Sequence, residues 1–333
     1  MRQSKFLSRN RINKELENIF YYPLTIVSAA MGYGKTTSVE NYLIGCKART
    51  IWVSVLGSDG SETVFWKKFG EAFEKLDKLT GEKLIKSSFP VDTLQIEETI
   101  DIIKKVNYEN DIVLVIDDYH IIEENKPVEK LVERIVQAKI EGLHLVLTSR
   151  TKPKLNYINF VSKGLCYFIS NDVLQFSKKE IKEYFELMNF HVTYKDIDKI
   201  YDYTNGWISG IYLIMLGLKN GLPVTEISEV NKLVQDNLYR NFNDETKKVL
   251  LELSILDNFT RNEAVEVLQN PKVPKILESL MAENAFIQFN KETGFYKIHN
   301  VLLDFLRKEL KINNMEVKEV TIEQVSGLQS RIK

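Results

Sequence analysis

The sequence predicts an α/β P-loop domain with a parallel five-stranded sheet, followed by a helical lid and a small α+β winged-helix domain. Three observations support this fold class. Short apolar runs typical of buried parallel strands alternate with segments of helical spacing up to about residue 176. A loop that contains glycines connects the first apolar run to a helix. Beyond residue 177 the pattern is helical, until two β-like runs precede a final helix.

The loop with glycines has the residue order of a Walker A phosphate-binding motif. An apolar run at 24–27 leads through small residues to Gly34, Lys35 and Thr36, where a helix at 36–45 begins. Glycines let backbone N–H groups turn toward phosphate oxygens, and the N-terminus of the helix adds partial positive charge. Ala29 replaces the first glycine of the usual pattern, and because alanine is the smallest substitute we interpret the loop as a variant. The motif predicts that the chain binds a nucleoside triphosphate.

The loop residues have separate expected roles. Lys35 is expected to bridge the β- and γ-phosphates, and the Thr36 hydroxyl is expected to ligate Mg²⁺. The expected cofactors are therefore ATP or ADP with Mg²⁺. The residues of this loop expected to bind the nucleotide are Ala29, Gly32, Tyr33, Gly34, Lys35, Thr36 and Thr37.

Composition limits the class of protein. The 333 residues predict two or three domains, and a formal net charge of −1 gives no electrostatic signature for nucleic acid or an anionic membrane. Cys46 and Cys166 are far apart without metal-ligand spacing, which favours a reduced, cytoplasmic chain. Residues 1–10 lack the apolar segment of a signal peptide, and the longest apolar stretch, 211–218, is shorter than the roughly 18 residues that span a bilayer. We expect a cytoplasmic protein without membrane contact.

The first domain, 1–176, is expected to follow the α/β pattern throughout. A helix is predicted at 6–20, packed beside the nucleotide domain, and polar connections are predicted at 57–60 and 81–90. The remaining predicted elements are strands at 50–55, 112–116, 143–147 and 166–169, and helices at 63–76, 94–106 and 126–140.

The second half is expected to divide into a helical lid at 177–222, a winged-helix-like domain at 223–312 and a polar tail at 313–333. Ser177 and Glu180 form a capping box that begins the lid, and Asn205 and Gly206 interrupt it. The predicted winged-helix elements are helices at 227–239, 244–254, 261–268 and 274–283, β-like runs at 285–289 and 295–298 with a turn at 291–294, and a helix at 301–310.

A second motif follows the apolar run at 112–116. Asp117 at the end of this buried strand fits a Walker B aspartate, which faces the phosphate loop and holds Mg²⁺. Asp118 occupies the position where many P-loop ATPases carry a catalytic glutamate, and its shorter side chain predicts slow hydrolysis. The alternative is that the two carboxylates only cap a turn after the strand.

Arg150 ends the next predicted strand. At that position an arginine can contact the γ-phosphate and respond to its presence, as a sensor residue. The alternative is an ordinary solvated surface charge.

Eight stretches occur in a fixed order along the chain: LSRNRI at 7–12, PLTIVS at 23–28, GYGKTT at 32–37, FW at 65–66, VIDDYH at 115–120, LHLVLTSR at 143–150, NGW at 205–207 and SILD at 254–257. This order resembles the N-terminal ATPase of MalT-type transcriptional activators, which are large ATP-binding regulators of the LuxR family within the STAND class of signal-transduction NTPases. The resemblance covers about residues 6–310. It implies a switch that is ADP-bound and monomeric at rest, and ATP-bound and self-associating when an inducer binds a downstream sensor domain.

The resemblance also implies site residues outside the strand ends. The stretch IHNVLLDFL at 298–306 is similar to a winged-helix motif of related STAND proteins, in which the histidine touches the β-phosphate of ADP; His299 stands at that position. A histidine at the start of a surface helix is the alternative. Arg9 and Arg11 are expected to line the adenine or ribose, or else to be solvated charges. Trp207 is expected to pack mainly in the core.

Relatives of this kind continue for several hundred residues to a DNA-reading helix-turn-helix, whereas this sequence ends at Lys333. The chain is thus either a fragment of such a regulator or a stand-alone module. We expect no direct DNA binding from this segment and at most a slow Mg²⁺-dependent ATPase. Two other functions stay open: an AAA+-like ATPase motor, and a winged-helix DNA-binding protein that carries a nucleotide domain.

Overall fold

The computed structural model describes residues 6–55, 62–108, 111–219, 228–282, 286–289 and 294–312. The chain divides into two compact units, one of Met1–Ala29 and Tyr33–Leu174, the other of Ala30–Gly32 and Gln175–Lys333. The predicted loop at 57–60, most of the predicted turn at 291–294 and the tail at 313–333 lie outside the described residues. The finer division into lid, winged-helix domain and tail stays a prediction.

The first unit contains the parallel sheet that the sequence predicts. Its strand order is β2-β3-β4-β1-β5, and all four neighbouring pairs are parallel. Strand β4 therefore lies between the strand before the phosphate loop and the strand that ends at Asp117. The strands are β1 (Leu24–Ser28), β2 (Arg49–Ser54), β3 (Ile112–Asp117), β4 (Leu143–Ser149) and β5 (Cys166–Ile169).

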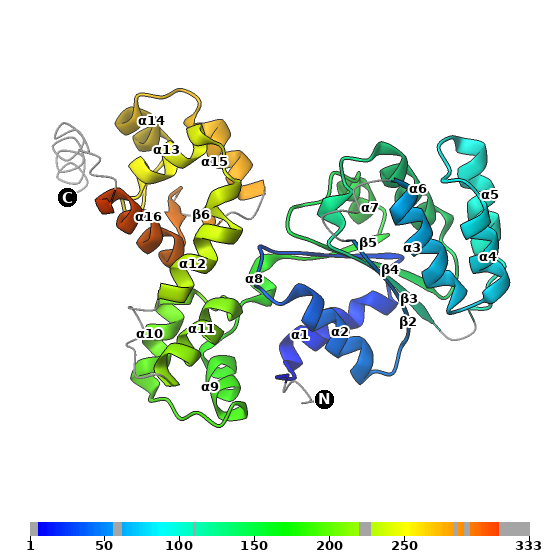
Figure 1. Ribbon diagram of the computed structural model, residues 1–333, viewed down its shortest axis with the longest axis horizontal. Helices are drawn as coiled ribbons and strands as arrows, with labels where there is room; N and C mark the ends of the chain where they lie inside the picture. The colour runs from blue at the N-terminus through cyan, green and yellow to red at the C-terminus, as the bar shows by residue number, and fades with distance from the viewer. Residues whose placement is uncertain are drawn as a thin grey trace. The chain divides into compact units, whose positions relative to one another are not determined.

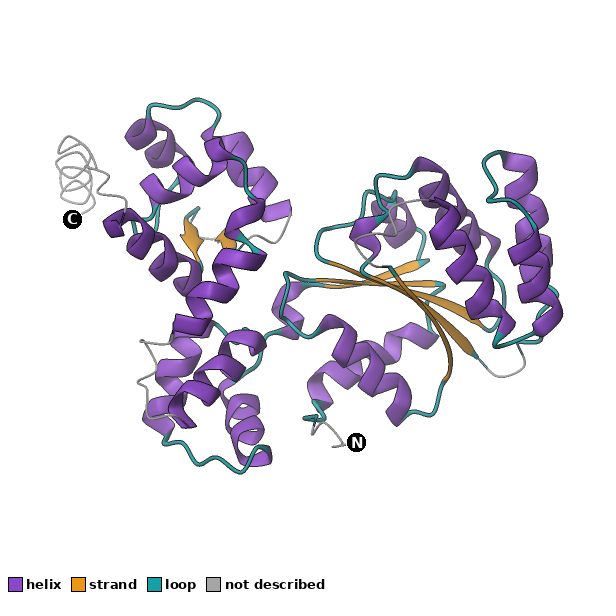
Figure 2. Ribbon diagram, in the orientation of Figure 1, coloured by secondary structure: helices purple, strands orange, loops and turns teal. Residues whose placement is uncertain are grey.

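Helices cover both faces of this sheet, which explains why its central strands consist of continuous apolar runs (Figures 1 and 2). One face carries α1 (Asn10–Leu16), η1 (Glu17–Phe20) and α2 (Lys35–Gly45). The other face carries α3 (Glu62–Glu74), α4 (Lys78–Lys86), α5 (Thr93–Ile103), α6 (Lys126–Ala138) and α7 (Tyr157–Ser162). Two short elements, η2 (Tyr119–Ile121) and α8 (Asn171–Leu174), follow β3 and β5.

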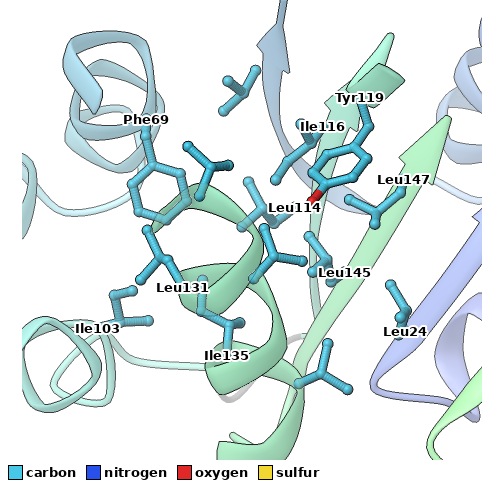
Figure 3. Close-up of a cluster of buried hydrophobic side chains, with 14 of the residues drawn as sticks. Leu24, Phe69, Ile103, Leu114, Ile116, Tyr119, Leu131, Ile135, Leu145 and Leu147 are labelled. Atoms are coloured by element: carbon cyan, nitrogen blue, oxygen red, sulfur yellow. The ribbon is translucent and has the colours of Figure 1, made fainter. Parts of the chain in front are cut away.

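The core of this unit lies between the sheet and the helices α3, α5 and α6, which cover one of its faces (Figure 3). Side chains that alternate along β3 and β4, such as Leu114, Ile116 and Leu147, meet Phe69 and Leu131 from the helices. All five side chains are 0% exposed. Their packing fixes the positions of the strand ends and of the residues just beyond them.

Residues 81–90 differ from the sequence prediction, because α4 occupies Lys78–Lys86 where we expected the polar connection to begin. The Asp77 side chain caps this helix by accepting from the Thr80 N–H at 2.7 Å. A Cβ at Gly81 would lie 2.3 Å from the Cα of Glu74 in α3, so the glycine allows the two helices to approach closely. The prediction was wrong because the segment is polar and contains a glycine, which suggested a loop. In the structure it forms the helix α4, which is stabilised by the Asp77 cap and by packing against α3.

The second unit is mainly helical, as predicted. The Ser177–Glu180 capping box is present at the start of α9, and β6 and β7 form an antiparallel hairpin next to the last helix. Its elements are α9 (Lys178–Leu187), α10 (Tyr194–Thr204), α11 (Ile208–Lys219), α12 (Ser228–Asn237), η3 (Tyr239–Asn241), α13 (Asp244–Leu253), α14 (Arg261–Leu268), α15 (Val273–Ala282), β6 (Ile287–Phe289), β7 (Tyr296–Ile298) and α16 (Asn300–Ile312). Within the ranges that the structure describes, we find no helix with the length and apolarity to cross a membrane.

Candidate nucleotide site

The phosphate loop leaves β1 at the carboxyl edge of the sheet. Ala29 still belongs to the sheet in its hydrogen bonding, since its N–H donates to the Ser149 carbonyl at 3.2 Å. Gly32 and Gly34 both have φ of +77°, a conformation that costs a glycine little and other residues more. Gly34 is the N-cap of α2 and places no side chain over the start of the helix. An anion can therefore approach the amides of the first turn.

Lys35, the first residue of α2, is a buried cation. Its side chain is only 7% exposed, and Nζ donates to the Ala29 carbonyl at 2.8 Å. The pKa of the ammonium is lowered to about 8: burial is the largest cause, Arg150 acts in the same direction, and Asp118 and Asp117 oppose the shift. Phosphate oxygens near Nζ would favour the charged form of the lysine, because they would add the negative charge that the buried site lacks.

Three oxygen-bearing side chains meet beside this lysine. The Thr36 hydroxyl donates to Asp117 Oδ1 at 2.8 Å, and the Thr148 hydroxyl donates to the same oxygen. Thr148 in turn accepts from the Asp118 backbone N–H at 3.0 Å. The strand order explains the meeting, because β4 carries Thr148 between the phosphate-loop strand and the Asp117 strand. Thr148 was not predicted as a site residue, although a threonine at the end of a buried apolar strand was the available signal.

Asp118 has an unusual backbone. Its φ of 56° and ψ of 44° lie in the left-handed region, and the chain turns there into η2. Its side chain is 36% exposed, and Oδ1 lies 3.7 Å from His120 Nδ1. The turn thus keeps the carboxylate at the sheet edge and brings His120 back beside it.

Arg150 follows β4 directly and is half-buried. Its charge lowers the pKa of both Lys35 and His120, which places the guanidinium in the same electrostatic surroundings as the phosphate-loop lysine. The structure therefore brings Lys35, Thr36, Asp117, Asp118 and Arg150 to one edge of one sheet. Their assigned chemical roles stay predictions.

A further carboxylate near this edge was missed by the sequence analysis. Glu123 is buried, and its oxygens accept from the Thr151 hydroxyl at 3.1 and 3.3 Å. Burial raises its pKa, and the hydrogen bond from Thr151 opposes that rise. The Ser28 hydroxyl donates to the Thr151 carbonyl at 2.9 Å, so this group connects the end of β1 with the segments that follow β3 and β4.

Arg9 and Arg11 contact the end of α8. Arg9 Nη1 donates to the Leu174 carbonyl at 2.9 Å, and Arg11 Nη1 donates to the Val173 carbonyl at 2.6 Å. Cations at the carbonyl end of a helix are favoured by its unpaired acceptors. A role for either arginine at the adenine or ribose stays a prediction.

In the second unit, His299 is 2% exposed and both of its ring nitrogens have backbone partners. Nε2 lies 2.8 Å from the Thr204 carbonyl and Nδ1 accepts from the Val301 N–H at 3.3 Å, so Nε2 carries the proton. Burial is the largest cause that lowers its pKa to about 4. The predicted contact between His299 and the β-phosphate of ADP requires Nε2 to exchange the Thr204 carbonyl for that ligand.

The same unit includes the tip of the phosphate loop, Ala30–Gly32. Trp207 Nε1 donates to the Met31 carbonyl at 3.0 Å, and the backbone N–H and hydroxyl of Ser209 both donate to the Gly32 carbonyl at 3.1 Å. Trp207 is 1% exposed and packs edge-on against Phe286, in line with the expected packing role. A Cβ at Gly32 would lie 2.7 Å from Trp207 Nε1, so only glycine fits there without displacement.

The oxygen atoms of Thr36 and Asp117 fit Mg²⁺. This ion prefers hard oxygen ligands and commonly takes only one or two from the protein, with phosphates and waters completing an octahedron. No group of three or more His, Cys, Asp or Glu side chains that could hold a metal occurs among the described residues. A metal here would therefore depend on the nucleotide for most of its ligands.

Comparison with known proteins decides the relationship of the chain. Residues 235–318 match the family model of the MalT winged helix domain. The HTH-type transcriptional regulator MalT of Vibrio cholerae is 24% identical over 318 residues, which cover 90% of this chain and 34% of that protein. MalT of Klebsiella pneumoniae strain 342 is 23% identical over 336 residues, which cover 95% of this chain and 37% of that protein. The chain is MalT-like.

The MalT-like chain spans about a third of the length of the curated relatives it matches. Among solved structures, the Walker-type ATPase PABY2304 of Pyrococcus abyssi is similar in fold, with a TM-score of 0.65 at 15% sequence identity. The alignment covers 92% of this chain and 97% of the archaeal one. The fold is that of a P-loop NTPase followed by a MalT-type winged helix, as the sequence predicts.

Proposed function

We propose that this chain is the nucleotide-controlled switch of a MalT-type transcriptional regulator, with ADP bound at rest and ATP bound on activation. The observation that carries the proposal is that the hydroxyls of Thr36 and Thr148 both donate to Asp117, beside the buried cation Lys35. These residue types, on a loop and two strand ends, are the ones that hold the phosphates and Mg²⁺ of a nucleotide. The likeness to MalT over most of the chain supports a regulatory role.

Within this proposal, each side chain has one task. Lys35 binds the β- and γ-phosphates, Thr36 and Asp117 hold Mg²⁺, and Arg150 contacts the γ-phosphate. The metal supplies positive charge that neutralises the phosphate oxygens when it is bound. Thr148 orients Asp117 and, through the Asp118 N–H, the turn after β3.

The proposed switch hydrolyses ATP slowly, and hydrolysis serves as its reset. Asp118 is one methylene shorter than the glutamate found at this position in many P-loop ATPases, so its carboxylate reaches less far toward the γ-phosphate. Only contacts that differ between ADP and ATP can change the state of the protein, however tightly both bind. Arg150 and the predicted ADP contact of His299 are the groups proposed to make that difference.

The proposal extends to partners that this chain does not contain. We propose self-association in the ATP-bound state, and an inducer that acts through a sensor region of the longer regulator. The proposed role of the winged helix is to regulate the nucleotide state rather than to read DNA, since the chain has a net charge of −1 and no basic excess. We propose that the protein acts in the cytoplasm.

The first experiment is to identify the nucleotide that the protein carries through native purification, by chromatography after denaturation. We expect close to one ADP per chain. Lys35→Ala should then lower nucleotide affinity by about 100-fold, because it removes a charge-assisted contact to phosphate. Lys14→Ala, which removes an exposed lysine of α1, should leave the affinity unchanged.

Two outcomes would contradict this proposal. If titration calorimetry detects neither ATP nor ADP binding, the chain is not a nucleotide switch. If the purified protein is empty and turns over ATP rapidly without a partner, the function is that of an ATPase motor instead.

A further inference from the structure

Two residues at the N-terminus of α11 hold the tip of the phosphate loop by its carbonyl groups. The indole Nε1–H of Trp207 donates to the Met31 carbonyl at 3.0 Å. The backbone N–H and the hydroxyl of Ser209 both donate to the Gly32 carbonyl at 3.1 Å. All four residues belong to the second unit, so three hydrogen bonds attach two consecutive peptide groups of the loop to that unit.

The Gly32 carbonyl also completes the N-terminus of α11. The first N–H groups of a helix have no acceptor within the helix and need one elsewhere. Ser209 is the second residue of α11, and its N–H finds that acceptor in the Gly32 carbonyl. The loop and the helix therefore depend on the same bond, because its loss would leave a donor of the helix and an acceptor of the loop unpaired.

The indole of Trp207 has little room to move. Its side chain is 1% exposed and lies edge-on to Phe286, with the ring centroids 5.2 Å apart. The Trp207 backbone N–H donates to the Thr204 carbonyl at 2.9 Å, and a Cβ at Gly210 would lie 2.6 Å from Cε3 of the indole. The second unit therefore sets the direction in which the indole N–H points.

A hydrogen bond to a carbonyl also sets the direction of the N–H in the same peptide group, because the two point in opposite directions in a trans peptide. With the Met31 carbonyl directed at Trp207, the Gly32 N–H points away from the indole. With the Gly32 carbonyl directed at Ser209, the N–H of Tyr33 points away from Ser209. Phosphate loops direct backbone N–H groups of this kind at phosphate oxygens.

We propose that Trp207 and Ser209 are positioning residues for the nucleotide: by holding two carbonyls, they keep the N–H groups of the loop tip directed at the phosphates that ADP and ATP share. This inference rests on the proposed function. Neither side chain touches the nucleotide in this role. Because the donors belong to the protein, they order the loop independently of the ligand, and binding then costs less conformational entropy. Without them, a peptide group of the tip can rotate and present its carbonyl oxygen, which repels phosphate.

The test measures the affinities of the full chain for ADP and ATP, with Mg²⁺, by titration calorimetry. Trp207→Phe keeps an aromatic ring but removes the indole N–H, and we expect it to weaken binding about tenfold. Ser209→Ala removes one of the two donors to the Gly32 carbonyl and should weaken binding about threefold. Both nucleotides should lose affinity by the same factor, because the loop tip faces phosphates that both carry.

A spectroscopic readout separates positioning from a general loss of structure. In the ¹⁵N-labelled wild-type chain, saturating ADP should move the Gly32 amide proton downfield, because a charged acceptor makes a stronger hydrogen bond. The Trp207 indole resonance should move little, since its bond to the Met31 carbonyl is retained. In Trp207→Phe and Ser209→Ala, saturating ADP should move the Gly32 amide less than in the wild type.

Two matched variants remove the same chemical groups elsewhere. Trp66→Phe removes an indole N–H that donates to the Ser87 carbonyl at 2.9 Å. Ser254→Ala removes a hydroxyl that donates to the Leu251 carbonyl at 2.6 Å. Both variants should leave the two affinities and the Gly32 shift unchanged, because neither bond involves the phosphate loop.

Each remaining outcome is decisive. If Trp207→Phe does not fold, as judged by its circular dichroism melt, Ser209→Ala decides alone, since that half-buried residue keeps its backbone donor. Unchanged affinities in the folded variants, an undiminished Gly32 shift, or a loss confined to ATP would overturn the inference and leave the proposed switch intact. A wild-type chain that binds neither nucleotide overturns both.

Discussion

His120 in the first unit and His299 in the second have similarly lowered pKa values but differ in burial and in their hydrogen bonds: the side chain of His120 is 17% exposed, and His299 is 2% exposed. For both, burial is the largest cause that lowers the pKa to about 4. Both ring nitrogens of His299 have backbone partners, Thr204 and Val301. In the part of the chain that the structure describes, Nδ1 of His120 has none. The comparison teaches that similar pKa shifts can accompany different hydrogen-bond surroundings, so the pKa shift alone does not reveal the role of a histidine.

The two rings also differ in the charged residues that shift their pKa values. Among the residues that the structure describes, Lys297 is the charged residue that contributes to the pKa shift of His299, besides burial and the bond to Thr204. His120 responds to Arg150, Lys35 and Asp117. One ring therefore joins two backbone segments of the second unit, and the other lies among the ionised groups of a candidate phosphate site.

The largest expected effect that tests this comparison is on stability. His299→Leu should destabilise the start of α16 by about 3 kcal/mol, because the Thr204 carbonyl and the Val301 N–H both lose a buried partner. His120→Leu should change the stability of its unit by less than about 1 kcal/mol, since it removes no hydrogen bond to Nδ1. Hydrogen–deuterium exchange of the α16 amides and of the β3 amides measures the two effects separately. Equal losses of protection would remove the distinction between the histidines.

The next effect in size is the contribution of His299 to the pH dependence of stability. The unfolded chain takes up a proton near the ordinary pKa of 6.5, and the folded chain only near 4, so stability is full above pH 6.5 and falls as the pH approaches 4. Between pH 7 and pH 5 this loss should amount to about 2 kcal/mol. Urea unfolding at pH 7, 6 and 5 should show it, and His299→Gln should have a shallower dependence. The same slope in the variant would assign the pH effect to other groups.

The smallest expected effect concerns the hydroxyl groups of two neighbouring strands. Thr148→Val should cost about 1.5 kcal/mol, because Asp117 loses a buried donor. Thr25→Val on β1 is the matched control: both threonines are 0% exposed, but Thr25 Oγ1 has no hydrogen-bond partner among the described residues. That variant should be neutral or slightly stabilising in urea unfolding. A similar cost at both positions would show that the polar network around Asp117 adds nothing beyond the fit of a threonine.

Much of the first unit was predictable from local patterns. Strands that are buried on both faces need apolar residues at every position, as in 112–116, and a parallel sheet brings the ends of such strands to one edge. The same reasoning predicts that Lys35, Thr36, Asp117 and Arg150 lie together at this edge. The capping box at Ser177 is equally local, since it involves residues three apart.

The rest depends on contacts between distant residues or on the backbone of single residues. The two bonds of Thr148 arise because β4 lies between β1 and β3, an order that strand composition does not reveal. The return of His120 beside Asp118 depends on one left-handed residue. The bond from His299 to Thr204 joins residues 95 positions apart, so no local pattern could indicate it.

The left-handed backbone at Asp118 also has a consequence for the rate of the proposed switch. Aspartate tolerates this conformation better than most residues, because its short polar side chain can bond locally. A glutamate there would reach farther but would strain the turn whose N–H donates to Thr148. If hydrolysis ends the ATP-bound state of the switch, the backbone conformation at Asp118 partly sets how long that state lasts. A substitution at this position that speeds hydrolysis would then loosen the turn, so the hydrolysis rate and the stability of the turn cannot be changed independently.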